Sequence, residues 1–192
     1  MTWNLQQMTR SSTFDPSELD QVDARLTSRL AFAKKIEDEP EAIPKLVKLM
    51  IQEGKPHHAK KAAWILDLIY SQSAEKLHPY LMQWIQALPQ LKIEAGRRVM
   101  AKIYALALAE HIEVLNDGTS RKKLISIFFD WLLDDHEVAI KANAMTALFT
   151  LGKYEDWVHP ELKRVLEEDA AKHSPAYRAR ARMTLAKIKN EH

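Results

Sequence analysis

The chain has 192 residues, of which 46% are hydrophobic and 28% are charged, as in an ordinary globular protein. Its net charge of +2 is too small for a protein built mainly to hold nucleic acid, and its lack of cysteine excludes disulfides, thiolate zinc sites and a thiol nucleophile. No apolar run approaches a membrane span and the N-terminus lacks the features of a secretory signal, so we expect a cytoplasmic location and no membrane partner.

The first part of the chain changes from a polar segment to a helical pattern. Residues 1–14 are polar and aperiodic, which predicts a flexible tail. Asp15, Pro16 and Glu18 then form a helix-start pattern, because Asp caps free amides, Pro suits the first turn and Glu can reach back to the cap. We therefore expect one helix up to about residue 37, within a single helical domain over residues 15–192.

Turn residues divide the rest of the chain into four helical hairpins. The predicted helix pairs are 40–53 with 56–72, 77–88 with 91–112, 120–134 with 136–151, and 159–171 with 175–190. In each pair the second helix is the more apolar, and the helix at 136–151 is apolar almost all round, which is typical of an interior helix. No segment shows the sustained alternation of a strand.

Short sequences recur at a nearly constant distance along these hairpins. Lys61-Ala62 returns as Lys141-Ala142 after 80 residues, and His78-Pro79 returns as His159-Pro160 after 81 residues. Weaker copies of the Lys-Ala sequence lie between and after these positions. The repeating unit is therefore about 40 residues long, which is the period of two-helix solenoid repeats.

The third hairpin carries the repeat most clearly, as Val138-x-x-Lys141-Ala142-x-x-Met145-x-x-Leu148. This order of a large residue, a basic residue, a small residue and spaced apolar residues resembles HEAT repeats over roughly residues 40–190. The whole chain also resembles small bacterial HEAT-like proteins. The resemblance implies an all-α fold, an α-α superhelix of the HEAT/armadillo kind, with about four hairpins, an extra N-terminal helix and second helices lining a concave surface.

Lys61 and Lys141 each fall within an otherwise apolar helical arc. A charge in such a place is unfavourable unless it is paired or its head group reaches water. The resemblance to HEAT repeats implies a structural ladder in which the basic residue joins an acidic one, and Asp67, Asp134 and Asp135 are the possible partners. Ligand binding by these lysines is the alternative.

The predicted second helices also carry basic residues that would form a stripe on the concave surface. The residues expected to bind a partner are Lys60, Arg97, Arg98, Arg178, Arg182 and Lys189. Such a stripe suits an acidic peptide or a phosphate backbone. HEAT-like alkylpurine DNA glycosylases combine a basic groove with aromatics and a carboxylate. A faint resemblance to this combination comes from Trp64 with Asp67 and from Trp131 with Asp135, so glycosylase activity is a remote alternative.

Two acid–histidine pairs recur with the repeat, Glu75-x-x-His78 and Asp156-x-x-His159. Both histidines precede proline, where helical geometry is disfavoured, so we interpret the pairs as turns between helices rather than as a metal site. His57 and His58 lie at a predicted helix start, without ligands at zincin spacing.

The motifs of known chemistries are missing from the sequence. It contains no Gly-rich phosphate loop, no Gly-x-Ser-x-Gly elbow and no nucleotide fingerprint. We therefore predict no catalytic, cofactor-binding or metal-binding residue. The predicted function is a non-catalytic scaffold whose concave face holds a protein or peptide, with nucleic acid as the alternative partner.

Overall fold

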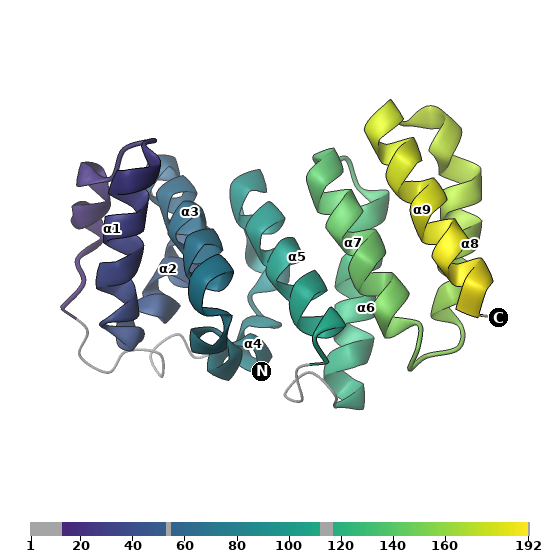
Figure 1. Cartoon of the computed structure of the whole chain (residues 1–192), viewed down its shortest axis with the longest axis horizontal. Helices are drawn as coiled ribbons and strands as arrows, with labels where there is room; N and C mark the ends of the chain where they lie inside the picture. The colour runs from purple at the N-terminus through teal and green to yellow at the C-terminus, as the bar shows by residue number, and fades with distance from the viewer. Residues whose placement is uncertain (1–12, 53–54, 112–116, 192) are drawn as a thin grey trace. The chain divides into compact units, whose positions relative to one another are not determined.

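A computed structural model describes residues 13–52, 55–111 and 117–191. Every regular element in these ranges is a helix (Figure 1), which confirms the all-α prediction. The chain divides into two compact units, Met1–Val99 and Met100–His192. Within the described ranges, no helix combines the length and apolar composition that a membrane crossing requires.

The predicted N-terminal tail lies mostly outside the described residues. Its last two residues are held in place: Phe14 is buried, and Thr13 Oγ1 donates a hydrogen bond to Glu39 Oε2 at 3.1 Å. Lys45 Nζ donates to the Phe14 carbonyl at 3.0 Å. Thr13 and Phe14, the first described residues, are therefore packed against the first unit.

The predicted single helix from Asp15 to about residue 37 is wrong, because the chain forms two helical elements. The 3-10 helix η2 (Pro16–Gln21) starts with the predicted capping box of Asp15 and Glu18, and α1 (Leu26–Glu37) follows after a break. At the break, Asp23 Oδ1 accepts a hydrogen bond from the Arg25 amide at 2.9 Å. An aspartate that bonds the backbone two residues on stabilises a turn in place of a helix.

The first unit contains the first predicted hairpin. Helix α2 (Ile43–Ile51) packs against α3 (Pro56–Ser73), and α1 packs against the same α3. Leu46, Ile65 and Ile69 are completely buried in these helices, and the burial of their apolar surface stabilises the unit. The predicted helix 77–88 is shorter than expected: α4 is His78–Trp84, and the 3-10 helix η5 (Leu88–Gln90) follows.

Helix α5 (Glu94–Ala109) begins in the first unit and ends in the second. The second unit then contains the other two hairpins, α6 (Gly118–Leu133) with α7 (Val138–Leu151), and α8 (Val158–Asp169) with α9 (Pro175–Glu191). Helix α7 packs against α6, α8 and α9. Ile140, Ala144 and Leu148 on α7 are fully buried, which confirms it as an interior helix.

Helix α9 differs from the prediction on one of its faces. Of its two apolar stripes, the one with Tyr177, Ala181 and Ile188 is buried as expected. The spacing of apolar residues over 175–190 also predicts a packing contact for a second stripe, Ala179, Met183 and Ala186, but Met183 and Ala186 are exposed. The described residues therefore leave this side of α9 exposed.

Candidate partner-binding surfaces

The predicted basic residues are distributed over both units. Lys60, Arg97 and Arg98 belong to the first unit; Lys60 Nζ lies 5.4 Å from the Trp64 ring centroid, and Arg97 Nη1 pairs with Glu94 Oε1 at 2.8 Å. Arg178, Arg182 and Lys189 are exposed on α9 in the second unit, together with Arg180 and Lys187. Each unit is described by itself, so a continuous stripe along both stays a prediction.

The two repeated lysines lie in different surroundings. Lys61 Nζ donates hydrogen bonds to the Leu19 carbonyl at 2.8 Å and to the Asp20 carbonyl at 3.3 Å. Lys141 is only 3% exposed, and its Nζ lies 5.9 Å from the Tyr177 ring centroid. Lys61 thus contacts η2, and the predicted structural ladder of Lys61 and Lys141 with Asp67 stays a prediction.

The repeated histidines lie at helix starts. His78 is the first residue of α4, and His159 is the second residue of α8. His159 is buried, its Nε2 donates to the Phe149 carbonyl at 2.8 Å, and its ring stacks on that of Phe149. These contacts support the interpretation of the His-Pro sequences as structural turns.

The aromatic side chains that suggested base stacking are occupied in packing. Trp131 is buried and makes an edge-to-face contact with Phe128 at 5.6 Å between ring centroids. Trp64 is in contact with two cations, since Arg29 and Lys60 each lie 5.4 Å from its ring centroid. Neither Trp therefore presents a free ring face to an extruded base.

A groove of about 700 Å³ lies between the first helices of the two hairpins of the second unit, α6 and α8. We call it the α6–α8 groove. Trp157 and Leu133 in it are 53% and 56% exposed, and Trp157 stacks on Phe129 with 5.9 Å between ring centroids. The remaining lining residues are Lys122, Ile125, Ser126, Asp130, Pro160, Glu161 and Arg164. The groove therefore combines an apolar floor with charges of both signs.

The basic charge on the α8 side of this groove is neutralised locally. Arg164 donates to Glu161 at 2.6 Å and to Glu168 at 2.8 Å. The Arg164 guanidinium lowers the pKa of Glu161, and the two carboxylates raise the pKa of Arg164. This wall of the groove thus has no excess positive charge that would favour a phosphate backbone.

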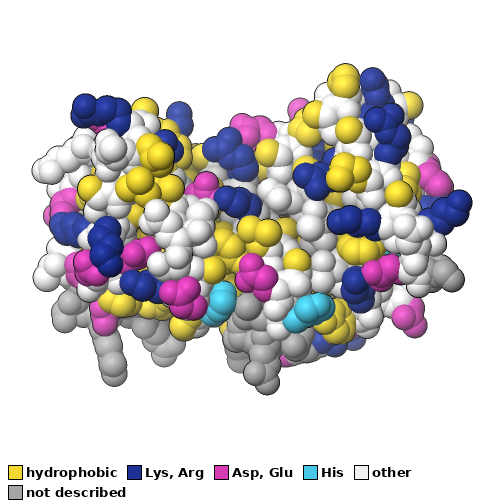
Figure 2. Space-filling view, in the orientation of Figure 1, with side chains coloured by type: hydrophobic (Ala, Val, Ile, Leu, Met, Phe, Trp, Pro, Cys, Tyr) yellow, Lys and Arg dark blue, Asp and Glu magenta, His cyan; other side chains and the backbone are white. Residues whose placement is uncertain are grey.

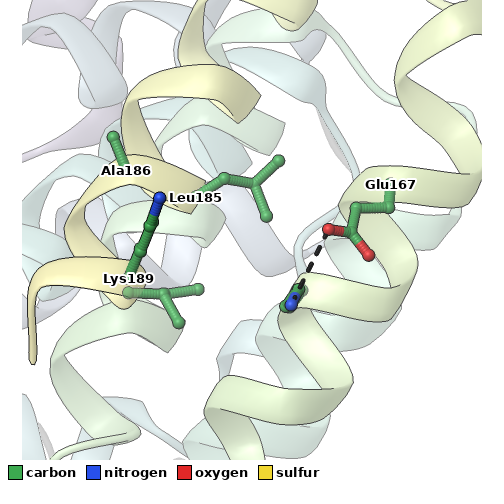
Figure 3. Close-up of a pocket in the computed structure, with 6 residues that line it drawn as sticks. Glu167, Leu185, Ala186 and Lys189 are labelled. Atoms are coloured by element: carbon green, nitrogen blue, oxygen red, sulfur yellow. Dashed lines mark ion pairs between the residues drawn. The ribbon is translucent and has the colours of Figure 1, made fainter. Parts of the chain in front are cut away.

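A second, smaller pocket of about 440 Å³ lies between α8 and α9 (Figure 3). Leu185, Ala186 and Lys189 line it from α9, and Glu167 faces them from α8. Glu167 Oε1 lies 4.0 Å from Lys163 Nζ on the same helix. This pocket adjoins the exposed apolar stripe of α9, so the second unit has two candidate contact surfaces.

The face of the second helices that Figure 2 shows carries charges of both signs. Over α3 in the first unit, and over α7 and α9 in the second, Figure 2 shows basic, acidic and apolar side chains side by side. Lys and Arg side chains are most concentrated over α9. A mixed surface of this kind favours a protein over a nucleic acid as partner.

Comparison with known proteins agrees with the helical hairpins and the repeat period. No curated protein and no solved structure matches the chain. A family model described as HEAT repeat domain matches residues 22–188, which include α1 and the hairpins up to the last turn of α9. The regular helix pairs, the recurring Lys-Ala sequence and this match together show that the chain belongs to the HEAT repeat family.

Proposed function

We propose that this chain is a non-catalytic scaffold that holds a protein or peptide partner. The observation that carries the proposal is the α6–α8 groove, where Trp157 and Leu133 expose apolar area to water. Exposed apolar surface surrounded by polar side chains is typical of protein-interaction sites. Membership of the HEAT repeat family, which is generally non-catalytic and typically mediates protein interactions, supports the same function.

The charges of the groove favour a particular kind of peptide. Lys122 and Asp130 both lie on α6 and are exposed, and their eight-residue separation corresponds to about 12 Å along a helix. A complementary peptide carries an acidic residue near Lys122, a basic residue near Asp130 and an aromatic or aliphatic anchor beside the basic residue. The anchor would pack on Trp157 and Leu133, since buried aromatic and aliphatic contacts contribute most of the binding energy at interfaces.

Nucleic-acid binding by α9 is the second candidate function. Arg178, Arg180 and Arg182 are exposed on this helix, as are Lys187 and Lys189, and Figure 2 shows the concentration of basic side chains there. However, Met183 and Ala186 are exposed on the same helix, and exposed apolar side chains do not contribute to phosphate contacts. We therefore rank α9 as a further protein-contact surface before nucleic acid.

Affinity capture with matched variants tests the proposed function. The full chain and the Trp157→Ser, Leu133→Ser double variant are used as baits in extracts of the native cell, each with and without nuclease. Leu26→Ser is the control bait, because Leu26 is 53% exposed on α1 in the other unit. Captured proteins are identified by mass spectrometry, and circular dichroism checks that all baits are folded.

Each outcome of this experiment bears on the proposal. We expect a protein partner that wild type and Leu26→Ser capture equally, that the double variant loses, and that nuclease does not remove. A partner that disappears on nuclease treatment would favour the nucleic-acid function. Equal capture by wild type and the double variant would show that the partner binds outside the α6–α8 groove.

A further inference from the structure

Three polar side chains from two separate elements converge in the first unit. His57 Nε2 and His58 Nε2, at the start of α3, lie 2.9 Å and 2.7 Å from Asp20 Oδ1 on η2. The three ligand-type atoms all lie within 4.8 Å of one another. Across residues 13–52, 55–111 and 117–191, this is the only such group of three or more His and acidic side chains. We call it the Asp20–His57–His58 cluster.

The two elements hold these side chains in place through separate contacts. Pro56 starts α3, so His57 and His58 fall in its first turn, and their rings meet edge-to-face with centroids 4.4 Å apart. On the other side, Lys61 Nζ bonds the Leu19 and Asp20 carbonyls and so fixes the backbone of η2 beside α3. The geometry of the cluster therefore depends on packed helices rather than on a loop, which is favourable for a binding site.

The exposure of the cluster suits entry of a small ligand from water. The His58 side chain is 8% exposed, whereas those of His57 and Asp20 are about half exposed. His58 thus forms the inner wall and the other two side chains form the open side. Hydrogen bonds from His58 and His57 lower the pKa of Asp20 to about 2, so its carboxylate is charged at neutral pH.

We propose that Asp20, His57 and His58 bind a divalent transition-metal ion of the Zn²⁺ type. Two imidazoles and one carboxylate are ligands that Zn²⁺, Ni²⁺ and Cu²⁺ accept, whereas Mg²⁺ and Ca²⁺ prefer oxygen ligands alone. In a site with metal–ligand bonds of about 2.0–2.2 Å, the ligand atoms lie slightly farther from one another than hydrogen-bonded atoms do. A small rotation of the exposed Asp20 side chain provides this wider separation. The ion binds the Nε2 lone pair of each neutral imidazole, whose proton moves to Nδ1 by exchange with water, and water completes the coordination.

Bound metal would join η2 to α3 and thereby stabilise the first unit. Ligands that bind only the folded chain raise its stability by mass action. Lys55 Nζ lies 3.9 Å from Asp20 Oδ2 and competes with the ion for this carboxylate. Its side chain is 62% exposed, so it can turn into solvent when the ion binds.

Titration with Zn²⁺ alone tests this proposal. Isothermal titration calorimetry is performed on the full chain without a histidine tag, as wild type, Asp20→Asn and His57→Gln. His136→Gln is the matched control, because His136 lies in the second unit, outside the cluster. Thermal unfolding followed by circular dichroism, with and without Zn²⁺, gives a second readout and shows that the metal-free variants are folded.

We expect one Zn²⁺ per chain and a raised melting temperature for wild type and for His136→Gln. Loss of one ligand should weaken Zn²⁺ binding by roughly tenfold or more, because the loss of a residue that only supports a ligand already weakens metal binding by that much. The melting temperature of Asp20→Asn and His57→Gln should then respond little to Zn²⁺. The proposal is overturned if wild type shows no saturable binding, or if both variants bind Zn²⁺ as tightly as wild type.

Discussion

At the scale of single residues, the absence of a side chain at Gly152 is required by His159. A Cβ atom on Gly152 would lie 2.1 Å from His159 Cδ2 and 2.4 Å from its Nε2. His159 cannot move away easily, because it is buried, stacked on Phe149 and bonded to the Phe149 carbonyl. Gly152 is therefore needed for close approach and not for an unusual backbone angle, since its φ is −64°.

Replacement of Gly152 by alanine should destabilise the chain. We expect a loss of roughly 1–3 kcal/mol in the free energy of unfolding, as for other overpacked cores. Gly118→Ala is the matched control, since its added Cβ would lie 3.7 Å from Arg121 Nη2 and cause no clash. Urea unfolding measures both. In a His159→Ala background the additional Gly152→Ala change should have little effect, and a full additive loss would contradict the assigned clash.

Two adjacent lysines on α3 should differ in their effect on stability. Lys61→Met removes the charged hydrogen bonds to the Leu19 and Asp20 carbonyls, so we expect a loss of about 1–2 kcal/mol in the free energy of unfolding. Lys60→Met is the control, because exposed Lys60 contacts the Trp64 ring and should change stability by less than about 0.5 kcal/mol. Urea unfolding of both variants is the measurement. Equal losses would contradict a structural role for Lys61.

At the scale of helices, the start of α6 depends on one carboxylate. Asp117 accepts hydrogen bonds from the Thr119 amide at 3.0 Å and from the Ser120 amide at 2.9 Å. Bonds from Ser120 and Thr119 lower the pKa of Asp117 below its ordinary value of 3.8. The charged cap also interacts favourably with the helix dipole.

The lowered pKa of Asp117 predicts a pH dependence with a definite sign. A carboxyl whose pKa is lower in the folded state contributes stability above its unfolded pKa, and this contribution disappears as the pH falls through the folded pKa. Asp117→Asn keeps a capping side chain but cannot titrate. Wild type should therefore melt at a higher temperature than Asp117→Asn at pH 7, and the difference should shrink as the pH falls below 3.8. A difference that stays constant from pH 7 to pH 2 would contradict this assignment.

Sequence patterns predicted these helices well wherever they depend on local chemistry. The capping box of Asp15 and Glu18 and the interior character of α7 both follow from spacing along a single helix. The break after η2 was not predicted, because the apolar spacing across it continues and the turn bond of Asp23 has no distinct sequence signal. Local patterns therefore predict helix starts better than interruptions.

The candidate sites could not be predicted in the same way, because they join residues that are distant in sequence. His58 and Asp20 are separated by 38 residues, and their meeting depends on the packing of η2 beside α3. The α6–α8 groove likewise depends on the placement of Trp157 next to Phe129. The sequence identified His57 and His58 only as a helix start, and nothing in it connected them with Asp20.

At the scale of the whole molecule, the repeat accounts for the regular helix pairs but not for the candidate sites. The recurring lysines and histidines make structural contacts within their units, such as Lys61 with η2 and His159 with Phe149. The candidate sites consist of residues that do not recur, namely Trp157 and Leu133 in one unit and the Asp20–His57–His58 cluster in the other. The candidate sites in this HEAT repeat protein therefore lie at departures from the repeat.

Site-specific photo-crosslinking in the native cell tests the central claim most directly. A photoreactive amino acid is placed either at Ser126, which is exposed in the α6–α8 groove, or at Arg182, which is exposed on α9. We predict a crosslink from position 126 to a protein partner, and its loss when Trp157→Ser and Leu133→Ser are added. Crosslinks to nucleic acid from position 182, with none to protein from position 126, would contradict the assignment of this chain as a protein-binding scaffold.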